Sequence, residues 1–154
     1  MGKAVFAFIV IGLLIGFSWP ARHARVPGGA GSLAHEVVLT RGSTGHFFTD
    51  ARVNGRADIH FVVDTGATIV ALTVDDARDL GLDIDPARFD VVGEGAGGAV
   101  RGQNVMIDRI TVGDLTVEHV PAVVLEGGTM SLLGQSFLSH IDHVDISGDY
   151  MSLH

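Results

Sequence analysis

Short apolar runs typical of β-strands alternate with turn residues along most of the chain from residue 35 onward. The runs 46–53 and 56–63 flank Asn54 and Gly55, a pair that tolerates the positive φ angles of a type I′ turn. The pattern therefore predicts a β-hairpin at this place. Further β-type runs, separated by turn residues, are 105–112, 115–117, 120–125, 144–147 and 150–153. The sequence thus predicts a mostly β domain.

Two short stretches are typical of helix instead. Thr73 precedes the run 74–80, with Asp76 three residues after it and Gly81 just past its end. This spacing resembles a capping box, and Gly is a common helix stop. The second predicted helix is 135–140, after Gly134. No repeat of fixed period and no heptad pattern accompanies them.

The first twenty residues have a different pattern from the rest. Residues 4–19 are almost uninterruptedly apolar, whereas a buried core helix would show a polar face. As a helix they would span about 24 Å, against a hydrocarbon core of about 30 Å. Residues 1–20 are therefore expected to be a membrane anchor or a signal segment. We favour an uncleaved anchor, because no small-residue cleavage site directly follows the apolar run.

Residues 21–32 are expected to be a flexible linker, because the stretch VPGGAGS at 26–32 offers few side chains that could pack. The folded domain is then 33–154. With 154 residues, 47% of them hydrophobic and 18% charged, the chain has the composition of one folded unit rather than of a disordered chain.

The charge pattern and the absence of cysteine exclude several classes of function. All 18 acidic residues lie after Gly28, together with 7 of the 10 basic residues, so this part carries a net charge of about 7 − 18 = −11. Such a surface repels phosphate backbones, so we expect no nucleic-acid partner. Without cysteine there is no disulfide framework, no thiolate zinc site and no cysteine nucleophile.

The stretch Phe61–Ala67, with the sequence FVVDTGA, is the most informative for chemistry. Three apolar β-formers predict a buried strand, and a carboxylate placed directly after them enters poor solvent, where ionisation is costly without partners. Asp64 is therefore a candidate functional residue. The hydroxyl of Thr65 can donate a hydrogen bond, and Gly66 allows a sharp turn that brings its backbone N–H toward the carboxylate.

This motif, preceded by the Asn-Gly hairpin and followed by IVALT at 69–73, resembles the active-site region of the retropepsin-like aspartic proteases. The stretch SLLGQSFL at 131–138 resembles the second signature of that family. The resemblance covers about 36–153 and is closest to the bacterial, membrane-anchored, single-domain members. It implies an all-β, retropepsin-like closed barrel with one or two short helices, a single domain and a dimeric active site. It also implies that Leu132 and Leu133 thread behind the Asp64 loop.

The family's catalytic residues correspond to Asp64, Thr65 and Gly66. Amide hydrolysis by aspartates requires two adjacent carboxylates, which share one proton because both cannot ionise at close range. The chain has one Asp-Thr-Gly, so the second carboxylate is expected from another copy, in a homodimer with two-fold symmetry. The resemblance assigns the Thr65 hydroxyl to a contact across the dimer and Gly66 to backbone support. No cofactor is expected.

The resemblance also implies a set of substrate-binding residues. The glycine-rich stretch 91–100 corresponds to the flap, a hairpin that closes over an extended peptide. The expected substrate contacts are Ala67, Glu94, Gly95, Ala96 and Gly97. Because Ala67 stands where many related sites have a Ser that donates to the carboxylate, we expect the paired aspartates to hold their shared proton to higher pH.

The sequence therefore predicts an aspartic endopeptidase that acts on a protein substrate, anchored in a bacterial inner membrane with its domain facing the periplasm. Two alternatives remain: a non-catalytic peptide-binding module of the same fold, and a structural envelope protein in which the Asp-Thr-Gly is incidental. His140 and His143 have a spacing that suits a metal on one helical face, but no third ligand is apparent. Ser131 and Ser136 lack a recognisable base.

Overall fold

The computed structural model describes residues 36–95 and 98–154. The expected anchor or signal segment at 1–20, the linker at 21–32 and the flap residues Ala96 and Gly97 lie outside these ranges, so the predictions for them stay predictions. Within the described ranges, no helix is long and apolar enough to cross a membrane.

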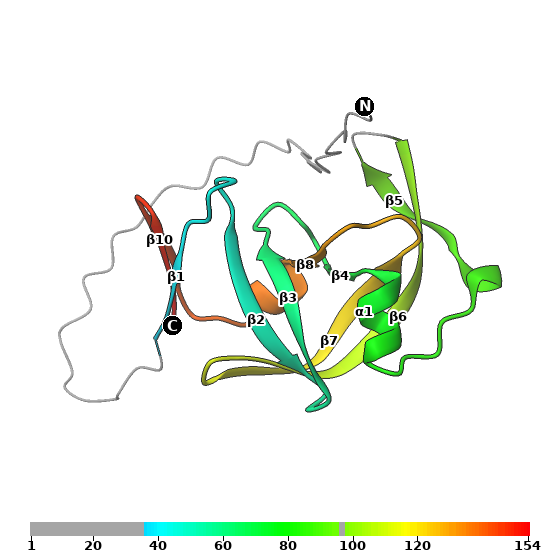
Figure 1. Ribbon diagram of the computed structural model, residues 1–154, viewed down its shortest axis with the longest axis horizontal. Coiled ribbons are helices and arrows are strands. Elements are labelled where there is room, and N and C mark those ends of the chain that lie inside the picture. The colour runs from blue at the N-terminus through cyan, green and yellow to red at the C-terminus, as the bar shows by residue number, and fades with distance from the viewer. Residues whose placement is uncertain (1–35, 96–97) are drawn as a thin grey trace, which may run out of the picture.

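Most of the described chain forms strands, and six of these strands close into a barrel (Figure 1). One sheet has the order β2-β3-β8-β4-β7-β6-β5, and β6 also pairs with β2. The ring from β2 to β6 is thus closed, and β5 extends beyond it. The strands are β1 (Val37–Thr40), β2 (Phe47–Val53), β3 (Ala57–Val63), β4 (Val70–Leu72), β5 (Asp90–Gly95), β6 (Gly98–Val112), β7 (Leu115–Leu125), β8 (Ser131–Leu133), β9 (Val144–Ser147) and β10 (Tyr150–Leu153).

The predicted hairpin is confirmed. β2 and β3 pair antiparallel, from Phe47 opposite Val63 to Val53 opposite Ala57. The turn between them has φ angles of 51° at Asn54 and 65° at Gly55, the positive values that a type I′ turn requires.

The runs 115–117 and 120–125, predicted as separate strands, form the single strand β7. His119 between them has a positive φ of 55°, which non-glycine residues seldom adopt. Pairing with β6 nevertheless continues in the same register on both sides, with Glu118 opposite Arg109 and Val120 opposite Ile107. One irregular residue therefore does not end the strand.

Both predicted helices are present, and the second is shorter than predicted. Helix α1 (Val74–Asp79) begins at Thr73, whose side chain accepts a hydrogen bond from the Asp76 N–H. Helix α2 (Gln135–Leu138) ends two residues early, because the N–H groups of His140 and Ile141 bond three residues back, in the tighter pattern of a helix end. A 3-10 turn, η1 (Pro86–Arg88), was not predicted.

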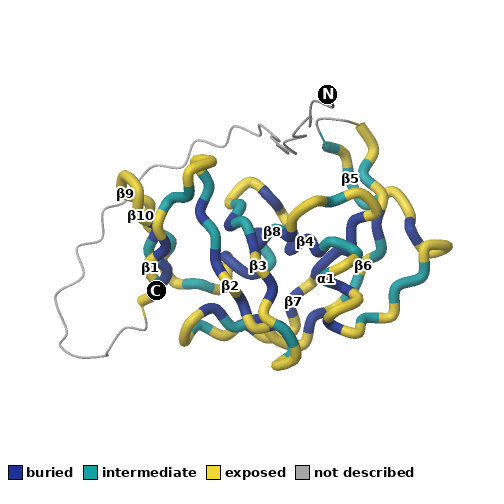
Figure 2. The backbone as a smooth tube through the Cα atoms, in the orientation of Figure 1, coloured by how far each residue is buried: buried dark blue, intermediate teal, exposed yellow. Residues whose placement is uncertain are grey.

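The buried apolar side chains form two separate clusters. Figure 2 shows that the buried residues are concentrated in the barrel strands. Inward side chains fill the barrel; the largest fully buried ones include Phe61, Phe137, Leu72 and Ile107. On the outward face, a smaller cluster contains Ala71, Val123 and Leu125, with Ile69, Val92, Val100 and Leu132 packed against it. All three residues of β4 are consequently buried, because both of its faces are covered.

A second sheet, with the order β1-β10-β9, closes one end of the barrel, whereas β5 extends from the other end (Figure 1). We call it the terminal sheet. Met151 and Leu153 of β10 point into the barrel core. Arg41 ties this sheet to the start of β2: its guanidinium lies 4.4 Å above the Phe47 ring and donates to the carbonyls of Gly45 and Gly148.

Two serine hydroxyls hold the ends of the short strand β4 in place. The Ser136 hydroxyl accepts a hydrogen bond from Val70 N–H (2.9 Å), at the start of β4. The Ser131 hydroxyl accepts one from Thr73 N–H (3.1 Å), just past its end, and donates to the Asp76 carboxylate (2.5 Å). Ser131 is fully buried, so these contacts satisfy a hydroxyl that would otherwise be costly to bury.

Gly134, between β8 and α2, lies where no side chain fits. A Cβ added there would be 2.5 Å from the carbonyl oxygen of Ile69 and 2.7 Å from that of Ala67. Both contacts are with backbone, so relief would require β8 to move away from the loop that follows β3.

We expect Gly134→Ala to lower the free energy of unfolding by about 1–3 kcal/mol, the usual cost of overpacking. Gly127→Ala is the matched control, because a Cβ there meets nothing within 4 Å, and its effect should stay within about 0.5 kcal/mol. Urea unfolding of the full-length variants measures both values. Equal stability of the two variants would show that the close approach at Gly134 is not a constraint.

Candidate active site

Asp64 stands directly after β3, at the start of a tight turn. Its backbone N–H donates to the Leu133 carbonyl (3.1 Å), and the Ala67 N–H donates to the Asp64 carbonyl (3.2 Å). The Gly66 N–H donates to the carboxylate Oδ1 of Asp64 (2.9 Å). The turn thus directs a backbone donor at the carboxylate, as the Asp-Thr-Gly sequence predicts.

β8 and the start of α2 support this turn from behind. β8 pairs in parallel with β3, with Leu132 opposite Val62 and Leu133 opposite Val63. Beyond β8, the backbone N–H of Gln135 donates to the Ala67 carbonyl, and its side-chain amide donates to the Thr65 carbonyl, each at 2.8 Å. The expectation that Leu132 and Leu133 pass behind the Asp64 loop is confirmed.

The turn itself lies nearer to solvent than the sequence suggested. Asp64 is half-buried, and Thr65 and Gly66 are exposed, whereas Ala67 is 8% exposed. The expectation of a carboxylate in poor solvent is therefore wrong for the single chain. The reason is that the burial of β3 ends at Val63, where the chain emerges at the rim of the barrel.

A groove with a volume of about 390 Å³ lies beside Asp64. Its lining comes from five neighbouring strands, β8, β4, β7, β6 and β5, and from the loop that follows β3. The strand pairing places Leu132, Ala71 and Val123 in one row across β8, β4 and β7. The groove residues are Asp64, Ala67, Thr68, Ile69, Ala71, Val92, Gly93, Glu94, Val100, Val123, Leu125 and Leu132. Most of them are apolar, so the groove suits an apolar side chain next to a carboxylate.

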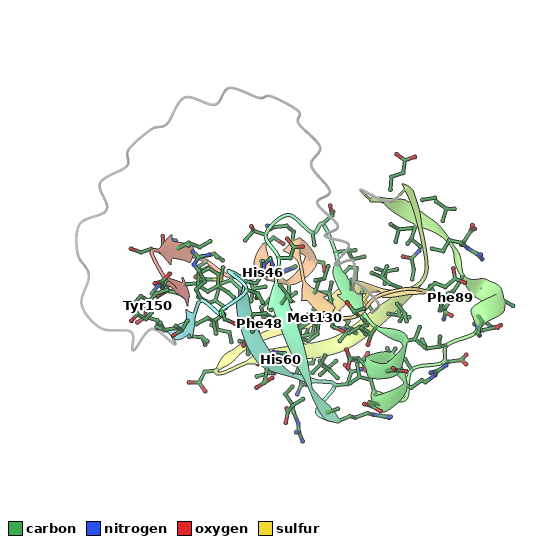
Figure 3. The ribbon with its side chains drawn as sticks, turned by 45° about the horizontal axis from the view of Figure 1, so that its top comes forward. His46, Phe48, His60, Phe89, Met130 and Tyr150 are labelled. Atoms are coloured by element: carbon green, nitrogen blue, oxygen red, sulfur yellow. The ribbon has the colours of Figure 1, made fainter. Side chains whose placement is uncertain are left out.

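The row of outward side chains continues beyond the groove. Val62 lies opposite Leu132 on one side and opposite Phe48 on the other. The Phe48 ring stacks on His60 with centroids 5.4 Å apart (Figure 3), and Nδ1 of His60 lies 2.7 Å from Oδ1 of Asp50. An extended ligand leaving the groove along this row would therefore meet an aromatic surface.

The predicted flap is a hairpin formed by β5 and β6, with Gly93 opposite Val100 and Glu94 opposite Ala99. We call it the flap hairpin. Glu94 lines the groove, and its contact with a substrate stays a prediction. Gly95 lies opposite Gly98 at the end of the described hairpin and is not part of the groove lining.

Sequence reasoning identified Asp64, Ala67 and Glu94 but missed most of the groove wall. The missed residues are Thr68, Ile69, Ala71, Val92, Gly93, Val100, Val123, Leu125 and Leu132. A signal was available, because the runs 69–72 and 122–125 are continuously apolar. Such runs are typical of strands that are covered on both faces, and here one of the two covered faces is the groove.

The other candidate constellations form no site within the described chain. The hydroxyls of Ser131 and Ser136 are engaged with backbone groups and with Asp76 or Pro121. His140 and His143 do not share a helix face, since α2 ends at Leu138. No group of three or more His, Asp or Glu side chains that could hold a metal ion occurs among the residues in 36–95 and 98–154.

Residues 49–140 match the family described as "gag-polyprotein putative aspartyl protease". The chain is 35% identical to an uncharacterized protein in the cobV 5′ region of Sinorhizobium sp, over 97% of this chain and 71% of that protein. It is 31% identical to the uncharacterized protein RP867 of Rickettsia prowazekii, over 77% of this chain. The match spans 51%, about half, of the Rickettsia protein.

Solved structures show the same fold. A retropepsin-like aspartic protease from Rickettsia conorii superposes with a TM-score of 0.64 and 29% identity, over 77% of this chain and 88% of that chain. The EIAV protease complexed with the inhibitor HBY-793 has a TM-score of 0.50 and 19% identity, over 66% and 93%; at this identity the likeness shows the fold alone. The predicted closed β barrel is thus confirmed. The chain belongs to the retropepsin-like aspartic protease family.

Proposed function

We propose that this protein is an aspartic endopeptidase that hydrolyses peptide bonds in a protein substrate. The observation that carries the proposal is the Asp64 turn, in which a carboxylate receives the Gly66 N–H and stands at the end of an apolar groove. Membership of an aspartic protease family supports the same reading.

The chemistry requires a second carboxylate. Two carboxylates about 3 Å apart share one proton: the ionised one accepts a proton from the attacking water, and the protonated one donates to the substrate carbonyl oxygen. The chain has a single Asp-Thr-Gly, so the second carboxylate is Asp64 of another copy, and the working unit is a homodimer with two-fold symmetry.

The residues around Asp64 have separate roles in this proposal. The Gly66 N–H holds the carboxylate orientation. The Thr65 hydroxyl makes no hydrogen bond within the described part of the chain, which leaves it available for a contact across the dimer. Ala67, which lines the groove beside Asp64, brings no hydroxyl to the carboxylates.

The groove and the flap hairpin indicate how substrate binds. An extended peptide lies between the groove wall and the flap hairpin, with an apolar side chain in the groove beside Asp64. The glycine-rich hairpin brings backbone N–H and C=O groups close to the peptide. Attachment to a bacterial inner membrane through residues 4–19, with the domain in the periplasm, is part of the proposal but rests on sequence alone.

Asp64→Asn should lower the rate of peptide cleavage by about 10²–10⁴-fold or more, because an amide of the same shape can neither share the proton nor activate water. Initial rates on a peptide library measure the loss. Asp108→Asn, an exposed strand residue outside the groove, is the control and should keep the wild-type rate. If Asp64→Asn cleaves a verified substrate as fast as wild type, the aspartic mechanism is wrong; if wild type binds peptides without cleaving any, the chain is a binding module.

The cleavage rate of the full-length protein should rise more steeply than in proportion to its concentration until the dimer is saturated. Excess Asp64→Asn protein should inhibit the wild-type protein by forming inactive mixed dimers, whereas excess Asp108→Asn should not. Sedimentation at the same concentrations gives the dimer fraction. A rate strictly proportional to concentration in monomeric samples would exclude the shared site.

A further inference from the structure

The flap hairpin leaves the barrel at Gly102 of β6. Gly102 pairs with Leu125 of β7 and also with Asp90 of β5. On the hairpin side of Gly102, residues 98–101 pair with β5 alone within the described chain, whereas the rest of β6 pairs with β7. A Cβ at Gly102 would lie 2.5 Å from the carbonyl oxygen of Val124, so β6 and β7 approach closely here. We call Gly102 the base of the flap hairpin.

Arg101, the first residue on the hairpin side of this base, joins three segments of the chain. Its Nη2 donates to the carbonyl of Phe89 (2.6 Å), the residue directly before β5. Its Nε lies 3.7 Å from the carboxylate of Glu126, the residue directly after β7. The Arg101 carbonyl also accepts a hydrogen bond from the Glu126 N–H (3.0 Å). Arg101 therefore ties both neighbours of β6 together where the flap hairpin begins.

The segment 83–89, which leads into β5, is only partly packed against the barrel. Residues 86–88, which form η1, are exposed. A cavity with a volume of about 330 Å³ separates the segment from α1, lined on one side by Val74 and on the other by Ile84. Phe89 is the buried residue of this segment, with 6% exposure, and Figure 3 shows it at the foot of the flap hairpin, beside η1.

Two side chains of β6 hold this segment by hydrogen bonds to its backbone. The side-chain amide of Gln103 accepts from the Asp85 N–H (3.0 Å) and donates to the Asp83 carbonyl (2.8 Å). Arg101 holds the other end of the segment, through the Phe89 carbonyl. Because packing holds the segment on one side only, these hydrogen bonds help to fix where β5 begins.

Arg101 has no place in the groove itself. It lies opposite Val91, which is 59% exposed, and neither residue lines the groove. The residues next to this pair do line the groove: Val100 from β6, and Val92 and Gly93 from β5. Any effect of Arg101 on a ligand in the groove therefore acts through the flap hairpin that carries these three residues.

We propose that Arg101 is a positioning residue for peptide cleavage, because it holds the flap hairpin at the position over the groove at which a peptide binds. The inference rests on the proposed function, in which an extended peptide lies between the groove wall and the flap hairpin. Without the guanidinium, the hairpin occupies this position for a smaller fraction of the time. The apparent dissociation constant of the peptide then rises in inverse proportion to that fraction.

The two contacts of the guanidinium contribute unequally. Arg101 and Glu126 are each 51% exposed and lie 3.7 Å apart, and an ion pair of this kind contributes little. The bond to the Phe89 carbonyl is short and partly buried, and a charged donor makes a stronger hydrogen bond than a neutral one. The planar guanidinium can make both contacts at once, whereas a lysine ammonium is a single point charge. We therefore assign most of the positioning effect to the bond with Phe89.

Arg101→Gln in the full-length protein tests the proposal on a peptide that the wild type cleaves. Loss of a charge-assisted hydrogen bond should raise KM about tenfold. The rate constant kcat should change by less than about twofold, because the hairpin binds the peptide equally in the ground state and the transition state. Initial rates are measured at a protein concentration at which sedimentation shows the dimer.

Arg109→Gln is the matched control. Arg109 lies in the same strand, and its ion pair with Glu118 (3.3 Å) has a similar exposure, but it is not part of the flap hairpin. This variant should keep the wild-type KM and kcat. Glu126→Gln should raise KM by less than about twofold, since an exposed ion pair contributes little. Arg101→Lys retains a charged donor and should give a KM between those of the wild type and Arg101→Gln.

Hydrogen exchange gives a measurement that does not depend on catalysis. In full-length Arg101→Gln, the amides of β5 should exchange about tenfold faster than in the wild type, because the hairpin opens locally more often. The amides of β3 should exchange at the wild-type rate. Arg109→Gln should leave both strands unchanged. Equally faster exchange in β3 and β5 of Arg101→Gln would show a general loss of stability and overturn the positioning role.

The outcomes separate this inference from the proposed function. A wild-type KM in Arg101→Gln, an equal rise of KM in Arg109→Gln, or a loss confined to kcat would overturn the positioning role. The aspartic mechanism would stand in each case if Asp64→Asn still abolishes cleavage. Faster exchange of β5 in Arg101→Gln, with no cleavage of any peptide by the wild type, would contradict the proposed function and leave the contact at the base of the hairpin intact.

Discussion

The parallel pairing of β8 with β3 is the contact on which the candidate active site depends. It joins segments about 70 residues apart. Forming it therefore costs conformational entropy, because the long intervening chain must be closed into a loop. The contact provides hydrogen-bond partners for three backbone groups of the turn. The Asp64 N–H bonds to Leu133, and the carbonyls of Thr65 and Ala67 bond to Gln135. The turn that carries the carboxylate is thus held by the end of β8 and the first residue of α2, and the close backbone approach at Gly134 leaves no room for a side chain there.

The strands next to this contact serve two surfaces at once. In β4 and β7, inward side chains such as Leu72 and Val124 fill the barrel, while Ala71 and Val123 form the groove wall. The barrel core and the groove wall are therefore formed by alternate residues of the same strands, since successive side chains point to opposite faces of a sheet. A substitution at an outward position can alter the groove while leaving the barrel interior packed.

The proposed function requires more than a single chain supplies. The half-buried Asp64 has one backbone donor and no second carboxylate in the described residues. At the end of the barrel, the terminal sheet buries Met151 and Leu153, and β9 is an edge strand of this sheet among the described residues. Under the proposed function, the association of two copies would supply the second carboxylate, Asp64 of the other copy.

The sequence by itself determined what depends on neighbouring residues. Asn54 and Gly55 specified the first hairpin, Thr73 specified the start of α1, and the Asp-Thr-Gly turn specified the donor to the carboxylate, because each of these is a local backbone or capping effect. Only the tertiary structure decided which strands lie side by side, and hence that residues 62, 71, 123 and 132 form one row beside Asp64. Strand order and burial on both faces depend on contacts between distant segments, which an apolar run of a few residues cannot encode.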